Sequence, residues 1–298
     1  MKCTVFLPHG ATPAILRFFE REGAEVRFEG TCYPEAFKAA QLEATTNPNA
    51  VLIPAYDDPV IWEGYSSMVR EIARQLPDAV KPDTLFCSVG GGGLAGGIMV
   101  GCKNVGWDDV PLVTMETTGS NCFYQSVLLN RKLQTGARAL PPHVEIVDDP
   151  QNGVRLALLK KLTSRASSLG ASMPSAGVVK MALERPGGVK CACGPDELAM
   201  QTTLSFADDH KMLVELACST TLIPAYNLAL FEKLVPAKAD GSRRTVVFVV
   251  CGGFKIDFDE LVEYNSIVKK EVENGVNTWE THVDGELVEI PKLGCPYS

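Results

Sequence analysis

Four consecutive glycines at positions 90–93 constrain the fold of this chain more than any other feature of its sequence. The residues before them, Thr84–Ser88, are short and apolar as in a buried strand, and the residues after them, Leu94–Asn104, have the composition of a helix. Glycine lets the backbone approach a ligand closely, and the N-terminus of a helix presents free N–H groups and a positive dipole to an anion. The sequence therefore predicts a phosphate-binding turn made of Gly90, Gly91, Gly92, Gly93 and Leu94.

Strand and helix patterns alternate along the first part of the chain. Short apolar runs favour strands at Thr4–Leu7, Ala24–Phe28, Val51–Ile53, Thr84–Ser88 and Pro111–Met115, with helices between them at Thr12–Arg21, Pro34–Thr45, Ile61–Leu76 and Leu94–Asn104. This alternation indicates an α/β fold with a mostly parallel sheet flanked by helices. Further helices are expected at Leu156–Ser168, Ala176–Glu184, Pro195–His210 and Thr221–Leu234, and a strand at Thr245–Val250.

Composition and charge exclude several classes of protein. The net charge of −8 argues against a nucleic-acid-binding protein, because such proteins need a basic surface. The uncharged segment Leu85–Cys102 is long enough to test as a membrane span, but its consecutive glycines would break a helix in the middle. Ten cysteines without a secretory signal indicate a reduced, cytoplasmic protein. We expect a small-molecule partner and neither nucleic acid nor membrane.

The glycine run also satisfies a second pattern of phosphate recognition. Gly91-x-Gly93-x-x-Gly96 matches the dinucleotide-binding fingerprint, and Glu116 follows at about the distance of a ribose-binding acid. The fingerprint is weak by itself, because any dense glycine run produces it. From these residues alone, a nicotinamide-dependent oxidoreductase remains an open alternative.

Five segments, in family order, resemble the serine/threonine dehydratases of the type II pyridoxal-phosphate fold, and most of all the eukaryotic L-serine dehydratase group. They are residues 57–64 (DDPVIWEG), 88–94 (SVGGGGL), 115–119 (METTG), 213–218 (LVELAC) and 249–253 (VVCGG), within a resemblance from about Thr4 to Leu261. The resemblance implies pyridoxal 5'-phosphate as cofactor and the β-elimination of serine, or threonine, to pyruvate or 2-oxobutyrate and ammonia. It also implies a homodimer that takes a small amino-acid substrate.

The same resemblance implies roles for individual residues. Residues Gly90–Leu94 would hold the cofactor phosphate, and Cys251 would face the pyridine nitrogen as a weak, uncharged thiol partner. In the family a monovalent cation, usually potassium, lies beside the cofactor, and the matching positions are Glu116, Ser120, Cys122 and the carbonyl groups of Leu169 and Ala171. The family often has serine where Cys122 stands. Hard cations prefer oxygen to sulfur, so this site is expected to be weakened or to use the Cys122 carbonyl.

No catalytic residue can be assigned from the sequence. In the family, the lysine that forms the Schiff base and a Ser-x-Gly-Asn loop precede the strand that Thr4–Leu7 resembles, and Lys2 has no such motif around it. We expect an N-terminally truncated dehydratase that is poorly stable and inactive by itself, with a non-catalytic binding protein derived from a dehydratase as the alternative. The expected division is an incomplete small domain over residues 1–54, a large cofactor-binding domain over 55–270 and a loose tail over 271–298.

Overall fold

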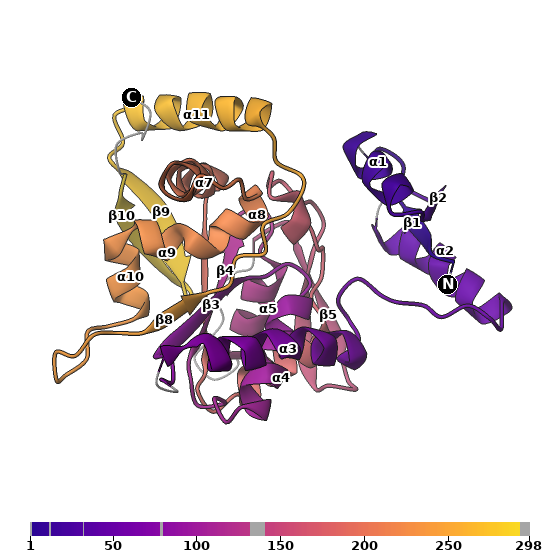
Figure 1. Ribbon diagram of the computed structural model, residues 1–298, viewed down its shortest axis with the longest axis horizontal. Coiled ribbons are helices and arrows are strands. Elements are labelled where there is room, and N and C mark those ends of the chain that lie inside the picture. Colours follow the sequence, from indigo (N-terminus) through magenta and orange to yellow (C-terminus); the bar gives the residue numbers. More distant parts are fainter. Residues whose placement is uncertain (1, 12, 32, 78–79, 132–140, 293–298) are drawn as a thin grey trace. The chain divides into compact units, whose positions relative to one another are not determined.

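The computed structural model describes residues 2–11, 13–31, 33–77, 80–131 and 141–292 (Figure 1). The chain forms two compact units, Met1–Ala55 and Tyr56–Ser298. The boundary expected from the sequence lies one residue earlier, between Pro54 and Ala55. None of the helices in the described ranges is long and apolar enough to cross a membrane.

The N-terminal unit is a small β–α–β arrangement. Strands β1 (Thr4–Leu7) and β2 (Glu25–Phe28) pair in parallel, and α1 (Pro13–Arg21) connects them. Helix α2 (Tyr33–Thr46) follows and packs against β1. Parallel neighbours require a crossover connection, which α1 provides, so the alternation seen in the sequence is realised in this unit.

A six-stranded sheet forms the centre of the C-terminal unit, in the order β10-β9-β7-β4-β3-β8. Four neighbouring strands are parallel, and they are β7 (Val189–Gly194), β4 (Leu112–Thr117), β3 (Thr84–Ser88) and β8 (Val246–Phe248). Strand β9 (Thr278–Val283) runs antiparallel to β7 and forms a hairpin with β10 (Glu286–Pro291). A separate antiparallel pair joins β5 (Val144–Asp149) to β6 (Val154–Leu159).

Helices cover both faces of the large sheet (Figure 1). One apolar core includes residues of α3 (Pro59–Gln75), α4 (Gly93–Asn104), α5 (Cys122–Arg131) and α6 (Ala176–Glu184). The opposite core includes α7 (Asp196–His210), α8 (Leu216–Ser219), α9 (Ile223–Tyr226), α10 (Leu228–Leu234) and α11 (Phe258–Glu273). Successive side chains of a strand point to opposite faces, so Leu85 and Cys87 join the first core while Phe86 joins the second. Short 3-10 turns complete the unit at Ser167–Leu169 and Thr220–Leu222.

Two elements expected from the sequence are wrong. The run Val51–Ile53 is not a strand, and the side chains of Val51 and Ile53 are 86% and 74% exposed, so no neighbour buries them. The segment Leu156–Ser168 is not a helix, because its first residues belong to β6, which pairs with β5. Periodicity alone does not distinguish a short apolar run in a strand from one in a helix or a linker.

The expected helix Thr221–Leu234 is interrupted. It divides into α9 and α10, and the side chain of Asn227 accepts a hydrogen bond from the N–H of Leu230 (3.1 Å), which starts a new helix. Asparagine competes for backbone hydrogen bonds in this way, which favours it at helix caps over helix interiors.

The loose tail expected over residues 271–298 is also wrong wherever the structure describes that segment. Helix α11 continues to Glu273, and β9 and β10 extend the large sheet. Trp279, Thr281 and Val283 are buried on alternate positions of β9. Glu280 and His282 alternate with them, and only Glu280 is exposed. This alternation of apolar and polar residues explains why the segment lacks a continuous apolar run.

Helix α4 packs closely against α3 because two of its glycines face that helix. A Cβ atom on Gly101 would lie 2.6 Å from Val69 Cγ2 and 2.7 Å from the Ser66 carbonyl oxygen. A Cβ atom on Gly97 would lie 2.3 Å from Tyr65 Cβ. The two helix backbones therefore approach more closely than any side chain at these positions would permit.

We predict that Gly101→Ala destabilises the protein by about 1–3 kcal/mol, because the added methyl group forces α3 and α4 apart. The midpoint of urea unfolding measures this change. Gly64→Ala is the matched control, since Gly64 lies in α3 and its added Cβ would meet nothing within 4 Å. This control should stabilise the helix by about 0.5–1 kcal/mol. Equal effects of the two substitutions would contradict the close packing.

Candidate functional site

The parallel strands place the predicted site residues at one edge of the sheet. Ser88 ends β3 and leads into the glycine turn, Glu116 lies at the end of β4, and Cys251 follows β8. Because β8, β3 and β4 are parallel neighbours, their carboxyl ends lie at the same edge. In open α/β sheets, ligands bind outside the carboxyl ends of the strands. The candidate site is therefore this edge.

The glycine turn presents backbone N–H groups at the start of α4. Gly92 is the N-terminal cap of α4, with a φ of 103°, a left-handed conformation that favours glycine. Within the described part of the chain, none of the N–H groups of Gly91, Gly92 and Gly93 donates to a protein acceptor. The first turn of α4 also contains no acidic residue. Buried N–H groups normally have partners, so this turn fits a bound anion such as a phosphate.

Neighbouring residues leave no room for side chains on the turn. A Cβ atom on Gly90 would lie 3.0 Å from Leu169 Cα, and one on Gly92 would lie 3.1 Å from Val178 Cγ1. The carbonyl oxygen of Gly91 accepts a hydrogen bond from the N–H of Ser175 (2.9 Å). These contacts hold the turn in place, and its N–H groups remain available to bind a ligand.

Tyr56 is a contact of the turn that sequence reasoning missed. A Cβ atom on Gly91 would lie 2.4 Å from the Cγ and Cδ1 atoms of the Tyr56 ring. The Tyr56 hydroxyl donates to the carbonyl oxygen of Met173 (3.0 Å), and its own carbonyl accepts from Trp62 Nε1 (2.8 Å). The only signal in the sequence is its position directly before the DDPVIWEG segment.

Glu116 is fully buried and caps α5. Its two carboxylate oxygens accept hydrogen bonds from the N–H groups of Phe123 (3.1 Å) and Tyr124 (2.6 Å). Burial raises the pKa of Glu116 well above its ordinary value of 4.5, and the two N–H groups oppose that change. The carboxylate is therefore enclosed by protein and is used as a cap for the first turn of α5.

The other residues predicted to surround a cation are joined by hydrogen bonds to one another and to the glycine turn. Ser120 Oγ donates to the Leu169 carbonyl oxygen (2.6 Å), which also accepts from the N–H of Ala171 (2.7 Å). The Cys122 thiol donates to the Gly90 carbonyl oxygen (3.6 Å). Among the residues described, no group of three or more His, Cys, Asp or Glu side chains could hold a metal ion. A cation here would therefore be held by one carboxylate with hydroxyl and carbonyl oxygens.

Cys251 is exposed and interacts with a second cysteine that the sequence analysis does not single out. The N–H of Glu215 donates to the carbonyl oxygen of Gly252 (2.8 Å), which joins the start of α8 to the segment after β8. A side-chain hydrogen bond from Cys218 lowers the pKa of Cys251 from 9.0 to about 7. The family resemblance implies an uncharged thiol partner at this position, and with a pKa of about 7 both the thiol and the thiolate are populated at neutral pH.

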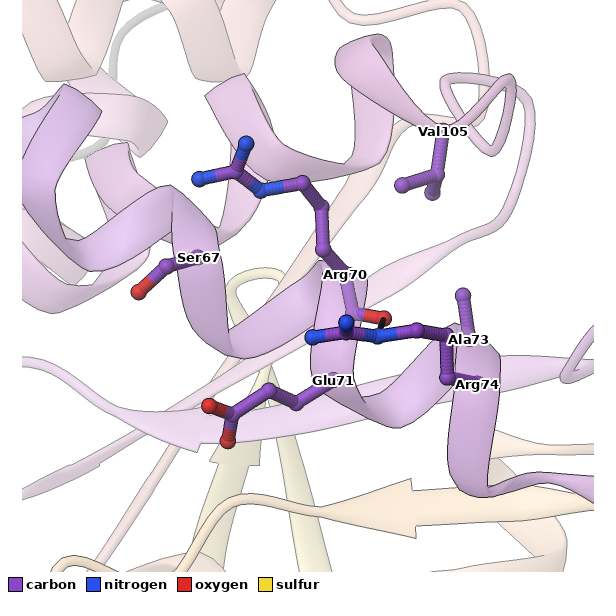
Figure 2. Close-up of a pocket in the computed structure, with 6 residues that line it drawn as sticks. All are labelled: Ser67, Arg70, Glu71, Ala73, Arg74 and Val105. Carbon is purple, nitrogen blue, oxygen red and sulfur yellow. Dashed lines mark hydrogen bonds between the residues drawn. The ribbon is translucent and has the colours of Figure 1, made fainter.

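A hollow of about 410 Å³ lies elsewhere on the C-terminal unit (Figure 2). It is lined by residues of α3 and by the residue that follows α4, namely Ser67, Arg70, Glu71, Ala73, Arg74 and Val105. Figure 2 shows the two arginines one turn apart on α3, with Arg74 Nε donating to the Arg70 carbonyl oxygen (3.3 Å). None of the predicted site residues lines this hollow, so the glycine turn remains the candidate site.

Comparison with known proteins identifies relatives of the whole candidate site. The family described as pyridoxal-phosphate dependent enzyme matches residues 1–252. The human L-serine dehydratase/L-threonine deaminase is 34% identical over 263 residues, covering 87% of this chain and 70% of the relative. The mouse protein named serine dehydratase-like is 35% identical, with the same shares covered.

Solved structures agree with these sequence relatives. The crystal structure of a fungal L-serine ammonia-lyase from Rhizomucor miehei superimposes with a TM-score of 0.69 at 26% identity, covering 89% of this chain and 74% of that chain. Threonine deaminase isoform 2 from Solanum lycopersicum has a TM-score of 0.67 at 17% identity, covering 92% and 67%, and it shows the fold alone. The predicted type II fold, an α/β fold with a parallel sheet between helices, is confirmed.

These findings decide between the two interpretations of the glycine run. The nicotinamide alternative required the Glu116 carboxylate to be accessible to a ribose hydroxyl, but that carboxylate is fully buried. The family match includes the glycine turn and extends to Gly252, one residue beyond Cys251. The cofactor is therefore pyridoxal phosphate, and the chain belongs to the family of pyridoxal-phosphate dependent enzymes.

Proposed function

We propose that this chain belongs to a serine dehydratase, an enzyme that acts on L-serine and also on L-threonine, and that the chain by itself lacks the Schiff-base lysine of that reaction. The overall reaction converts L-serine to pyruvate and ammonia, and L-threonine to 2-oxobutyrate and ammonia. The water lost in the elimination is returned when the enamine product hydrolyses. The observation that carries the proposal is the glycine turn at the end of β3, whose N–H groups have no acceptor in the described protein. The names of the relatives support the substrate class.

In this proposal, the N–H groups of Gly90–Gly93 and Leu94 bind the phosphate. They belong to the turn that precedes α4 and to its first residues, where the helix dipole adds a favourable interaction with a dianion. No lysine or arginine side chain is needed, because several charge-assisted hydrogen bonds and the dipole stabilise the negative charge. The bound cofactor supplies an electron sink that stabilises negative charge at the substrate α-carbon.

Cys251 would interact with the ring nitrogen from the end of β8. The thiolate form of Cys251 can accept a hydrogen bond. Cys218, in α8, stabilises this thiolate by donating a hydrogen bond to it. With a pKa of about 7, the Cys251 side chain would be partly thiol and partly thiolate at neutral pH. It would therefore hold the ring nitrogen in its protonated form less completely than a fully ionised carboxylate would. Such a partner is sufficient for β-elimination, which needs only modest stabilisation of the carbanion.

We also propose that Glu116, Ser120, Cys122, Leu169 and Ala171 surround a monovalent cation, K⁺. The Leu169 carbonyl oxygen and the Ser120 hydroxyl oxygen already lie within hydrogen-bond distance of each other, so both would be available as neutral oxygen ligands of a cation. At Cys122 the carbonyl oxygen is the better ligand, because hard cations prefer oxygen to sulfur. The donor types, rather than a preformed cage, support this assignment.

A cytoplasmic location and a homodimer are parts of the same proposal. Eight cysteines in the described residues are free thiols, which supports a reducing compartment. The homodimer is proposed on the family resemblance. No lysine of this chain has the motif of the family's Schiff-base lysine around it, so we propose that the chain alone binds the cofactor without turnover.

The first test concerns phosphate recognition. We predict that the chain binds pyridoxal phosphate on the order of 100-fold more tightly than pyridoxal, which lacks the phosphate, as measured by calorimetry. Gly92→Ala should reduce this preference by about tenfold or more, because alanine disfavours the left-handed conformation of the turn. Gly106→Ala is the control, since Gly106 also has a positive φ but lies at the other end of α4. Equal affinity for the two ligands would rule out the phosphate site.

The second test concerns the reaction. We expect no pyruvate from L-serine with the chain and pyridoxal phosphate alone, in an assay coupled to lactate dehydrogenase. Methylamine, a primary amine that can replace the missing lysine amine, should give slow pyruvate formation. Cofactor binding with no pyruvate under either condition would favour the non-catalytic binding protein instead.

The third test concerns Cys251. We predict that the rate of its alkylation by iodoacetamide rises with pH around a midpoint of about 7, in line with its pKa. Cys218→Ala should move the midpoint to higher pH, because the thiolate loses the hydrogen bond that lowers its pKa. Exposed Cys3, followed by mass spectrometry in the same sample, controls for general reactivity. An unchanged midpoint in the variant would contradict the role of Cys218.

A further inference from the structure

We infer that Tyr56 is a positioning residue of the phosphate-binding turn, and that its ring and hydroxyl fix the direction of the turn's N–H groups. The inference rests on the proposed function, because it concerns the affinity of the same site for phosphate. It assigns a role to a residue that no sequence motif marks. Three sets of contacts carry it.

The first contact is the face of the ring. A Cβ atom on Gly91 would lie 2.4 Å from Tyr56 Cγ, 2.4 Å from Cδ1 and 2.5 Å from Cδ2. Nearly equal distances to three ring atoms mean that the ring lies flat over the Gly91 backbone. A Cβ atom on Gly93 would lie 3.0 Å from Tyr56 Cβ. The Tyr56 side chain therefore packs against two of the four glycines and prevents their backbone from moving toward it.

The second set of contacts fixes Tyr56 at both ends. Trp62 Nε1 donates to the Tyr56 carbonyl oxygen (2.8 Å), which holds the backbone. The Tyr56 hydroxyl donates to the Met173 carbonyl oxygen (3.0 Å), which holds the tip of the ring. Trp62 is itself buried among glycines, since a Cβ atom on Gly177 would lie 2.7 Å from Trp62 Cη2. The ring is consequently held rigidly over the turn.

The third contact connects the segment bound by the Tyr56 hydroxyl to the backbone of Gly91. Met173 lies two residues before Ser175, whose N–H donates to the Gly91 carbonyl oxygen (2.9 Å). In a planar trans peptide, the carbonyl of Gly91 and the N–H of Gly92 point in opposite directions. Holding the Gly91 carbonyl toward Ser175 therefore aims the Gly92 N–H to the opposite side. By anchoring both the 173–175 segment and the Gly91 backbone, Tyr56 sets this orientation.

The test compares the affinities for pyridoxal phosphate and for pyridoxal in the full chain and its variants. Tyr56→Phe removes only the hydroxyl anchor and should reduce the preference for the phosphate-bearing ligand about fivefold, the effect of one lost hydrogen bond. Tyr56→Leu also removes the ring face and should reduce the preference more than about tenfold. The dissociation constant for pyridoxal should stay unchanged in both variants. Tyr65→Phe, at a half-exposed tyrosine of α3, is the matched control and should change neither affinity.

The ratio of the affinities for pyridoxal phosphate and pyridoxal reports the effect of a substitution on phosphate binding. The midpoint of urea unfolding reports its effect on the stability of the fold. An unchanged ratio in Tyr56→Phe would overturn the inference, and so would an equal loss of affinity for both ligands. Should the unsubstituted chain show no preference for the phosphate, the proposed function itself would fail and this inference with it. A preference that is present in the unsubstituted chain and retained in Tyr56→Phe would refute only the role of Tyr56.

Discussion

The parallel pairing of β3 with β4 and β8 is the constraint on which the rest of the site depends. It brings the ends of three strands, which are far apart in the sequence, to one edge of the sheet. The glycine turn follows β3, Glu116 is the residue before the last of β4, and Cys251 follows β8. A cofactor that needs a phosphate cradle at one end and a ring partner at the other can be held only if these ends are adjacent. The backbone hydrogen bonds of the sheet provide that adjacency.

Much of this arrangement could be predicted from the sequence because its signals are local. The strand, the glycines and the following helix form one continuous segment, and α6 has the bounds Ala176–Glu184 that its pattern indicates. The hairpin of β9 and β10 was not predicted, although the sequence Asp284-Gly285 is typical of a tight hairpin turn. In the structure both residues have the positive φ values of such a turn. Its half-exposed strands lack an apolar run, and periodicity read for buried strands does not detect them.

The contacts that shape the site were harder to predict because they join distant parts of the chain. Cys218 affects Cys251 from another element, and Glu116 serves as a helix cap as well as a predicted cation ligand. Tyr56 reaches Met173 across 117 positions of the sequence. Each contact depends on how helices pack on the sheet, and a single sequence does not encode that packing in its spacing. The sequence indicated which residues lie at this edge, but not the partners that change their pKa values or fix their orientation.

The division of the chain into two units has a mechanical consequence. Ala55 is the last residue of the N-terminal unit and Tyr56, whose ring covers the glycine turn, is the first residue of the other. One peptide bond thus connects the clamp on the turn to the entire preceding unit. A torsion at that bond would act first on the backbone of Tyr56, the residue whose ring lies against Gly91.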